Sequence, residues 1–220
     1  MQKPCKKCQT VFEAPDDSVL NRFTPFCPAC ATERREADEK TEAARISGER
    51  EARWQAICPP AYRDTVIEKL PNPNKATEIL AWNYGATGLL LHGKTRKGKS
   101  RCAWLLVRKT FEAGKSIRVL DSMAGFHYGA VFANSGREAL EWVEARSKCG
   151  LLFFDDVFKV KLTDSFEAAV FAIVDYRISH NLPILATLND VGDTLAARMT
   201  SDRGEAFVAR LREMCHVIQF

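Results

Sequence analysis

The sequence has no long apolar run, since no stretch approaches the ~18 consecutive apolar residues that a membrane-spanning helix needs. It opens MQKPCKKCQT, without the apolar segment of a secretory signal. It has little excess charge either: 32 Lys and Arg against 28 Asp and Glu leave +4, which alone does not indicate a nucleic-acid partner. Its 46% hydrophobic residues exclude a wholly disordered chain. We therefore expect a cytoplasmic protein with no membrane partner.

Cysteine is the residue type that is unusually abundant, with eight in 220 residues. A reducing compartment disfavours four disulfides, and clustered cysteines there more often hold metal. Two CxxC pairs, Cys5 with Cys8 and Cys27 with Cys30, have the spacing of a four-thiolate zinc site. So short a segment buries too little apolar surface to fold alone, so that Zn²⁺ would supply folding free energy. We predict a zinc-binding module over residues 1–32; unrelated thiols or a redox pair are the alternatives.

The next segment is dense in charges of both signs. Residues 33–57 place these charges at helical spacings, which predicts a solvated linker helix that Gly48 weakens. Four prolines then bound a short element between positions 59 and 73. We place the larger domain at 58–220.

That domain alternates short apolar runs with helical patterns. Alternation of this kind predicts right-handed crossovers and an α/β fold with a five-stranded parallel sheet. The expected strands lie in residues 88–93, 116–122, 149–156, 182–189 and 215–220. The expected helices lie in residues 99–113, 136–147, 164–180 and 203–214.

The first expected strand runs directly into a GxxxxGK[ST] motif, the P-loop. Its residues are Gly93, Lys94, Thr95, Arg96, Lys97, Gly98, Lys99 and Ser100. Glycines let the backbone curl so that N–H groups face a phosphate chain, and the following helix adds its positive end. We expect these residues to bind ATP, with Lys99 reaching the β- and γ-phosphates and Ser100 a ligand of Mg²⁺.

Two further strands end in polar residues typical of an ATPase site. Leu151–Asp156 has the Walker B form: Asp155 would hold the Mg²⁺ shell and Asp156 would polarise the attacking water. Many such ATPases place Glu at the second position, so the shorter Asp156 predicts either slow hydrolysis or a carboxylate that must be repositioned. Asn189 would lie between the carboxylates and the γ-phosphate if its strand lies between the first and third; a turn-forming role is the alternative.

Three arginines precede the last strand. An arginine supplied to a neighbouring subunit's γ-phosphate would stabilise the charge of the transition state. Arg210 is the first candidate and Arg203 the second, whereas a merely basic helix face is the alternative.

Four segments together resemble one family. They are CPPAYRD at 58–64, the Asp155–Asp156 pair, TLN at 187–189 and GEAFVARL at 204–211. They are similar to the AAA+ ATPases of the DnaC/DnaI helicase-loader and IstB transposition-helper group. The resemblance runs from residue 58 to the end and implies an AAA+ (ASCE) core without a C-terminal lid, with Arg210 as the arginine finger. It departs after Walker B, where Val-Phe-Lys stands in place of the group's Leu/Ile-Gly turn.

The resemblance also implies partners. The group suggests an ATPase in DNA replication that self-associates on ATP, binds single-stranded DNA and delivers a replicative helicase. Candidate DNA contacts are Phe126, Tyr128 and Phe132, with Arg137 or Lys159; a core position is the favoured alternative, for Phe132 first and Phe126 second. The alternatives are an IstB-type helper that directs a transposase, a zinc adaptor switched by ATP, and a P-loop kinase of small molecules.

Overall fold

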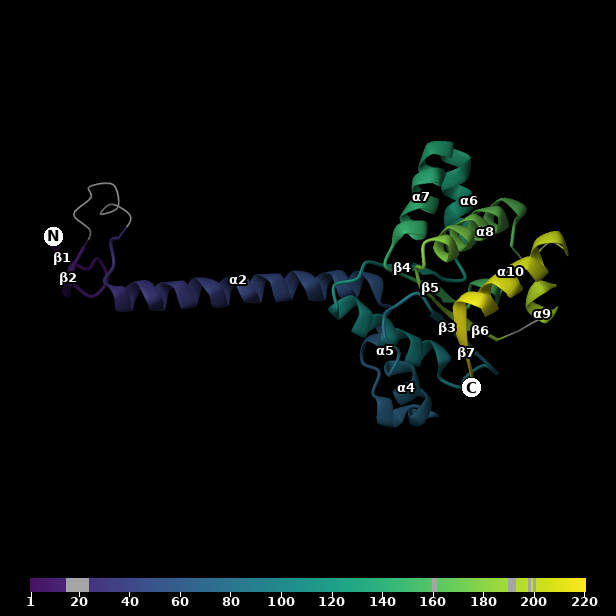
Figure 1. Cartoon of the computed structure of the whole chain (residues 1–220), viewed down its shortest axis with the longest axis horizontal. Coiled ribbons are helices and arrows are strands. Elements are labelled where there is room, and N and C mark those ends of the chain that lie inside the picture. The colour runs from purple at the N-terminus through teal and green to yellow at the C-terminus, as the bar shows by residue number, and fades with distance from the viewer. Residues whose placement is uncertain (15–23, 160–161, 190–192, 198, 200) are drawn as a thin grey trace. The chain divides into compact units, whose positions relative to one another are not determined.

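The chain forms two compact units, Met1–Ala56 and Ile57–Phe220, in the computed structural model (Figure 1). The structure describes residues 1–14, 24–159, 162–189, 193–197, 199 and 201–220. None of the helices within these ranges has the length and apolarity needed to span a bilayer. Each unit is described by itself.

The first unit begins with a small antiparallel hairpin. Strand β1 (Gln2–Pro4) pairs with β2 (Val11–Glu13), with Lys3 opposite Phe12. The buried side chains here are Cys5, Cys27 and Cys30, together with Ala14. Phe12 and Phe26 pack against the three cysteines. Among the residues described here, the hairpin therefore has almost no apolar core apart from the cysteines packed against it.

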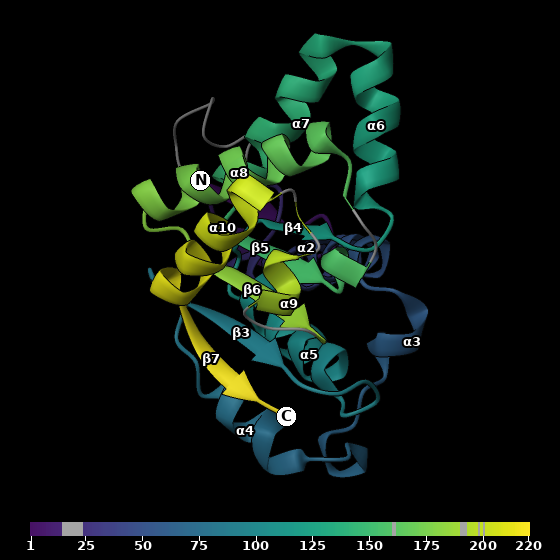
Figure 2. The ribbon, with the colours of Figure 1, turned by 90° about the vertical axis from the view of Figure 1, so that its right-hand side faces the viewer.

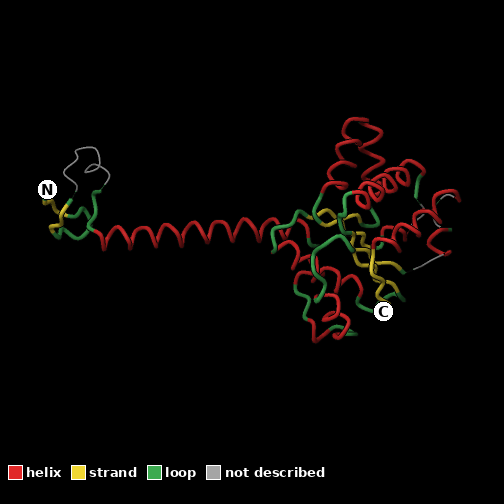
Figure 3. Tube along the Cα trace, viewed as in Figure 1, coloured by secondary structure: helices red, strands yellow, loops and turns green. Residues whose placement is uncertain are grey.

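Helix α2 (Pro28–Ile57) is continuous through Gly48 (Figure 3). It begins at Pro28, five residues before the expected linker helix, because proline suits the first helical position, where no intrahelical N–H bond is lost. Its polar residues surround the helix, a pattern stabilised by ion pairs three and four residues apart. Arg45 makes two such pairs, with Glu42 at 2.6 Å and with Glu49.

The second unit contains a five-stranded parallel sheet of order β4-β5-β6-β3-β7. Its strands are β3 (Gly88–His92), β4 (Ile117–Leu120), β5 (Leu151–Asp155), β6 (Ile184–Leu188) and β7 (Cys215–Gln219). The predicted α/β class and parallel sheet are confirmed. Strand β6 lies between β3 and β5, so the carboxyl ends of these three strands are neighbours.

Helices cover both faces of the sheet (Figures 1 and 2). One layer holds α4 (Pro73–Leu80) and α5 (Lys99–Glu112), and the other holds α6 (Ala124–Asn134), α7 (Gly136–Lys148), α8 (Asp164–Ser179) and α10 (Ser201–Met214). The short turns are α3 (Pro60–Arg63), η1 (Ile67–Lys69), η2 (Val157–Lys159) and α9 (Asp193–Ala196).

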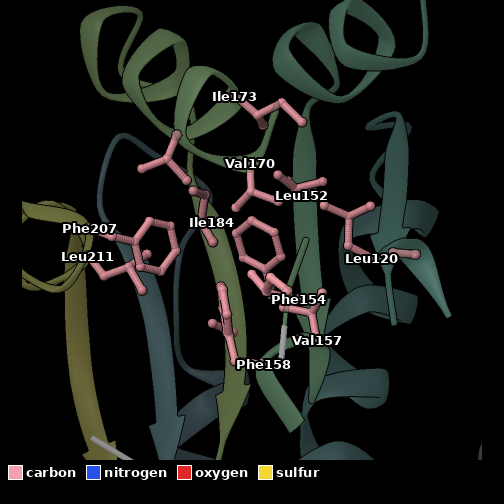
Figure 4. Packing of buried hydrophobic residues seen from close by; sticks show 14 of the residues in the cluster. Leu120, Leu152, Phe154, Val157, Phe158, Val170, Ile173, Ile184, Phe207 and Leu211 are labelled. Carbon is pink, nitrogen blue, oxygen red and sulfur yellow. The ribbon is translucent and has the colours of Figure 1, made fainter. Parts of the chain in front are cut away.

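The main core fills the space between the sheet and α8 with α10 (Figure 4). Leu152 and Phe154 of β5 point into it, together with Ile184 of β6. Because successive strand residues face opposite sides, Phe153 points the other way and meets Trp104 of α5 at 5.2 Å between ring centroids. Asp155 follows Phe153 to that side, which brings it to the amino-terminal turn of α5.

Arg177 of α8 holds the starts of β5 and β6 together. It is completely buried and donates to the carbonyls of Cys149 at 2.8 Å and Pro183 at 2.6 Å. It also donates to the carbonyls of Arg146, Ser147 and Gly150. Burial lowers its pKa. These five acceptors fix the two strands whose far ends carry Asp155 and Asn189.

Candidate nucleotide and metal sites

The loop of residues 93–98 joins β3 to α5 through a backbone that only glycine adopts easily. Gly93 has φ +142° and Gly98 has φ +93°, both in the left-handed half of the backbone map. A Cβ at Gly93 would lie 2.5 Å from the carbonyl oxygen of Phe220. The predicted P-loop therefore occupies the strand–loop–helix position that phosphate binding requires.

Lys99 joins this loop to the end of β6. Its Nζ donates to the carbonyls of Gly93 at 2.7 Å and Lys94 at 2.9 Å, and to Oδ1 of Asn189 at 3.0 Å. The side chain is 5% exposed, and burial lowers its pKa, against the opposing effect of Asp156. A buried ammonium at the N-terminus of a helix is suited to attract an anion.

Asp155 accepts hydrogen bonds on both carboxylate oxygens. Ser100 Oγ at 2.8 Å and Thr187 Oγ1 at 2.9 Å donate to Oδ1, and Trp104 Nε1 donates to Oδ2 at 3.3 Å. Burial raises the pKa of Asp155, whereas these three donors lower it. A hydroxyl and a carboxylate in contact are the ligand pair that a P-loop site uses to hold Mg²⁺.

Asp156 takes a left-handed backbone conformation, with φ +53°, that Asp adopts more readily than most residues. Its N–H donates to Thr187 Oγ1 at 3.1 Å, and its Oδ1 accepts from Asn189 Nδ2 at 3.3 Å. Asn189 therefore links Asp156 to Lys99, in the place expected for it between β3 and β5.

Lys99, Ser100, Asp156 and Asn189 line one cavity of about 550 Å³, and Asp155 contacts Ser100 beside it. A volume of this order is typical of a small-molecule site. The residues that line it are Tyr62, Pro71, Thr95, Arg96, Lys97, Gly98, Lys99, Ser100, Arg101, Asp156, Lys159 and Asn189. Five of these twelve residues are basic, and they line the cavity together with Asp156, which favours a polyanionic ligand accompanied by a cation.

Comparison with known proteins gives matches in structure only. No protein-family model and no curated protein matches this sequence. The DnaC helicase loader has TM-score 0.56 and 17% identity, over 76% of this chain and 98% of that one. DnaI has TM-score 0.55 and 19% identity, over 67% of this chain and 81% of that one.

A third solved structure is the replication initiator DnaA bound to AMPPCP and single-stranded DNA, with TM-score 0.56 and 14% identity. The match covers 74% of this chain and half of that one. The second unit has the AAA+ fold. Identities below 20% establish this fold alone, so the roles of individual residues rest on their geometry.

Arg210 of the AAA+ unit does not line the cavity of its own chain. Its Nε donates to Oδ1 of Asp175 on α8, and its guanidinium lies 4.6 Å from the ring centroid of Phe171. Arg203, the second candidate, is exposed on the same helix. The structure thus places both arginines on α10, and neither lines this cavity.

The four amino-terminal cysteines converge, with all Sγ atoms within 4.8 Å of one another. The Sγ atoms of Cys8 and Cys27 are 3.7 Å apart, close to the ~3.8 Å that tetrahedral Zn–S bonds of ~2.3 Å imply and far beyond a disulfide. Burial raises the pKa of Cys5, but backbone N–H groups of Cys8, Cys27 and Lys7 outweigh it and hold the value at about 6. The cluster can hold a metal ion.

The pKa of Cys30 shifts in the opposite direction. Hydrogen bonds with Cys8 and Cys27 raise the pKa of Cys30, since a second thiolate beside the first is unfavourable. A divalent cation would remove this conflict by allowing all four thiolates to form.

The burial of the candidate DNA contacts differs from the expectation. Tyr128 is buried, 7% exposed, and its ring stacks 5.8 Å from that of Phe132, so its proposed surface role is wrong. Phe126 and Phe132, the residues that suited a core, are 68% and 53% exposed. Lys159 lines the cavity beside Lys99 and Asn189.

Sequence reasoning missed three residues that contribute to the site. Trp104 follows Ser100 by four positions on α5, and this spacing places both on one helix face, a usable signal. Thr187 of β6 precedes Asn189, the first residue after that strand, by two positions, which likewise places both on the α5 side. Tyr62 comes from α3, and nothing in its local sequence indicates that it reaches the cavity.

Proposed function

We propose that this chain is an ATPase of DNA replication that binds ATP with Mg²⁺ and acts as a helicase loader. One observation carries the proposal: Lys99, Ser100, Asp156 and Asn189 line one cavity, and Asp155 accepts a hydrogen bond from Ser100. These are the groups required for binding a triphosphate, holding its metal and directing a water toward it.

The residues divide the work by position. The N–H groups of residues 93–98 and the start of α5 would bind the phosphates, with Lys99 on the β- and γ-phosphates. Ser100 and Asp155 would hold Mg²⁺, whose charge neutralises the developing negative charge. Asp156 would polarise the attacking water, and Asn189 would orient both the water and the γ-phosphate.

Arg210 would complete the site of a neighbouring copy. Its pairing with Asp175 and its position over Phe171 hold the guanidinium at the surface of α10. A cation placed there can stabilise transition-state charge only in another subunit. ATP-dependent self-association is therefore part of the proposal.

Single-stranded DNA and a replicative helicase are the proposed partners. Support comes from the fold shared with the DnaC helicase loader and DnaI, and with a DnaA solved with single-stranded DNA. Exposed Phe126 and Phe132 on α6 offer flat rings for bases, and Arg137 on α7 lies 87% exposed. The cysteine cluster with Zn²⁺ would form the module that engages the helicase.

A native co-purification tests the partner. Tagged full-length protein is isolated from its source cell with ATP or ADP, beside the Lys99→Met variant as the control that cannot respond to ATP. ATP-dependent recovery of a hexameric helicase supports the loader. Recovery of a transposase instead would reassign the chain to the IstB-type function, and identical recovery with both nucleotides and the variant contradicts an ATP-driven partner.

Asp156 favours a second candidate, an adaptor in which ATP acts chiefly as a switch. Its short side chain is already held by Asn189, and its backbone N–H is held by Thr187. Both contacts oppose the movement that would bring the carboxylate to a water. Multiple-turnover ATPase assays with and without single-stranded DNA distinguish the loader from the adaptor. The adaptor predicts that bound ATP persists under both conditions.

A further inference from the structure

Trp104 is the largest side chain beneath the proposed magnesium site. It lies on α5 one turn after Ser100 and is 2% exposed. Its ring stacks on Tyr62, with centroids 5.9 Å apart and planes 15° apart, and meets Phe153 edge-on. An aromatic residue on each side therefore fixes the direction of its indole N–H.

That N–H donates to Oδ2 of Asp155, whereas the two hydroxyl groups contact Oδ1. Oδ1 accepts from Ser100 and Thr187, whereas Oδ2 accepts from Trp104 at 3.3 Å. The last torsion of an Asp side chain is broad, so its partners decide how the carboxylate is turned. Donors on both oxygens hold the plane of the carboxylate in one orientation.

We propose that Trp104 is a positioning residue for the magnesium site, because its N–H holds Oδ2 of Asp155 and thereby keeps Oδ1 turned toward Ser100. The inference rests on the proposed function of the cavity as a Mg²⁺-dependent nucleotide site. Groups that hydrogen-bond to a ligating carboxylate typically change metal affinity or activity 10–100-fold when removed.

The role requires the indole nitrogen and not merely an aromatic ring. Phenylalanine would fill much of the space between Tyr62 and Phe153 but donates no hydrogen bond. Site-specific 3-benzothienylalanine is a closer probe, since sulfur replaces the N–H within the same bicyclic shape. Trp82→Phe is the matched control: Trp82 Nε1 also donates, to the Thr87 carbonyl at 2.9 Å, away from the cavity.

The experiment measures Mn²⁺ affinity of the full-length protein with saturating AMPPCP by electron paramagnetic resonance, which requires no turnover. AMPPCP affinity in EDTA is measured alongside. For Trp104→Phe and for benzothienylalanine at 104 we expect Mn²⁺ to bind about 10-fold more weakly. Metal-free AMPPCP affinity stays within twofold, and Trp82→Phe matches the wild type in both.

The outcomes distinguish failure of the proposed nucleotide site from failure of the role of Trp104 alone. Wild-type protein that binds no Mn²⁺–AMPPCP overturns the proposed function and this inference with it. Wild-type binding that the benzothienylalanine protein retains overturns the role of Trp104 alone. Should Trp104→Phe not fold, the benzothienylalanine protein decides. A parallel loss of metal-free affinity also contradicts it, since that would indicate damage to the whole cavity.

Discussion

Replacing Lys99 with methionine should abolish tight ATP binding while leaving the AAA+ unit folded. Methionine keeps most of the buried stem but loses the ammonium, which donates to Gly93, Lys94 and Asn189. In the proposed complex the ammonium would serve the β- and γ-phosphates. Two hydrogen bonds between charged groups at about 1.5–3 kcal/mol each are worth about 3–6 kcal/mol, or roughly 10²–10⁴-fold in dissociation constant.

Titration with a fluorescent ATP analogue measures this affinity, and urea unfolding confirms that the variant is folded. Lys109→Met is the control, because Lys109 also lies on α5 and also donates to two backbone carbonyls, those of Leu80 and Trp82. It lies outside the cavity, so its variant should bind ATP as the wild type does.

Folded Lys99→Met that binds ATP within threefold of the wild type would contradict this role of the ammonium. In that case the basic loop would not be a phosphate site, despite its geometry. Equal weakening in Lys109→Met would also refute it, because the effect would then come from α5 as a whole.

Three further predictions test the remaining features. Arg210→Ala should keep ATP affinity but lower ATP turnover about 10³-fold, and Arg212→Ala is the control. The specific activity of the wild type should also rise with protein concentration. Turnover that does not depend on concentration contradicts a role between subunits. Elemental analysis should find one zinc per chain, and this zinc should be lost in Cys27→Ser but kept in Cys58→Ser. Zinc that remains in both variants would exclude the four-cysteine cluster as its site. Arg177→Met should lower the free energy of unfolding by about 3–5 kcal/mol, whereas Arg137→Met at an exposed position should lower it by less than ~0.5 kcal/mol. Equal urea midpoints for the two variants would show that the five carbonyls do not depend on Arg177 for hydrogen bonds.

Much of the AAA+ unit could be predicted because its signals are local. Continuous apolar runs such as Leu151–Phe154 belong to strands buried on both faces, and such runs alternate with helical spacing along the chain. The P-loop follows the same logic, since Gly93 and Gly98 stand where φ must be positive. Helix α6 escaped prediction because Gly125 and Gly129 lower its propensity, and packing of Tyr128 overrides that cost.

Exposure was the property that sequence reasoning handled least well. Phe126, Tyr128 and Phe132 are of similar type within seven residues, yet only Tyr128 is buried. The choice follows from neighbours distant in sequence, since Trp142 of α7 and Phe166 of α8 close over Tyr128. No local pattern contains that information.

Residue types at fixed short spacing are enough to predict the five strands, the P-loop motif, the acidic strand end and the paired cysteines. Tertiary packing placed β6 between β3 and β5, bringing Asn189 to Lys99 and Asp156. It likewise decided that Trp104 donates to Asp155 and that Arg210 stays outside its own cavity. These relations join segments far apart in the chain, and they exist only once crossover connections and packing have placed the strand ends side by side.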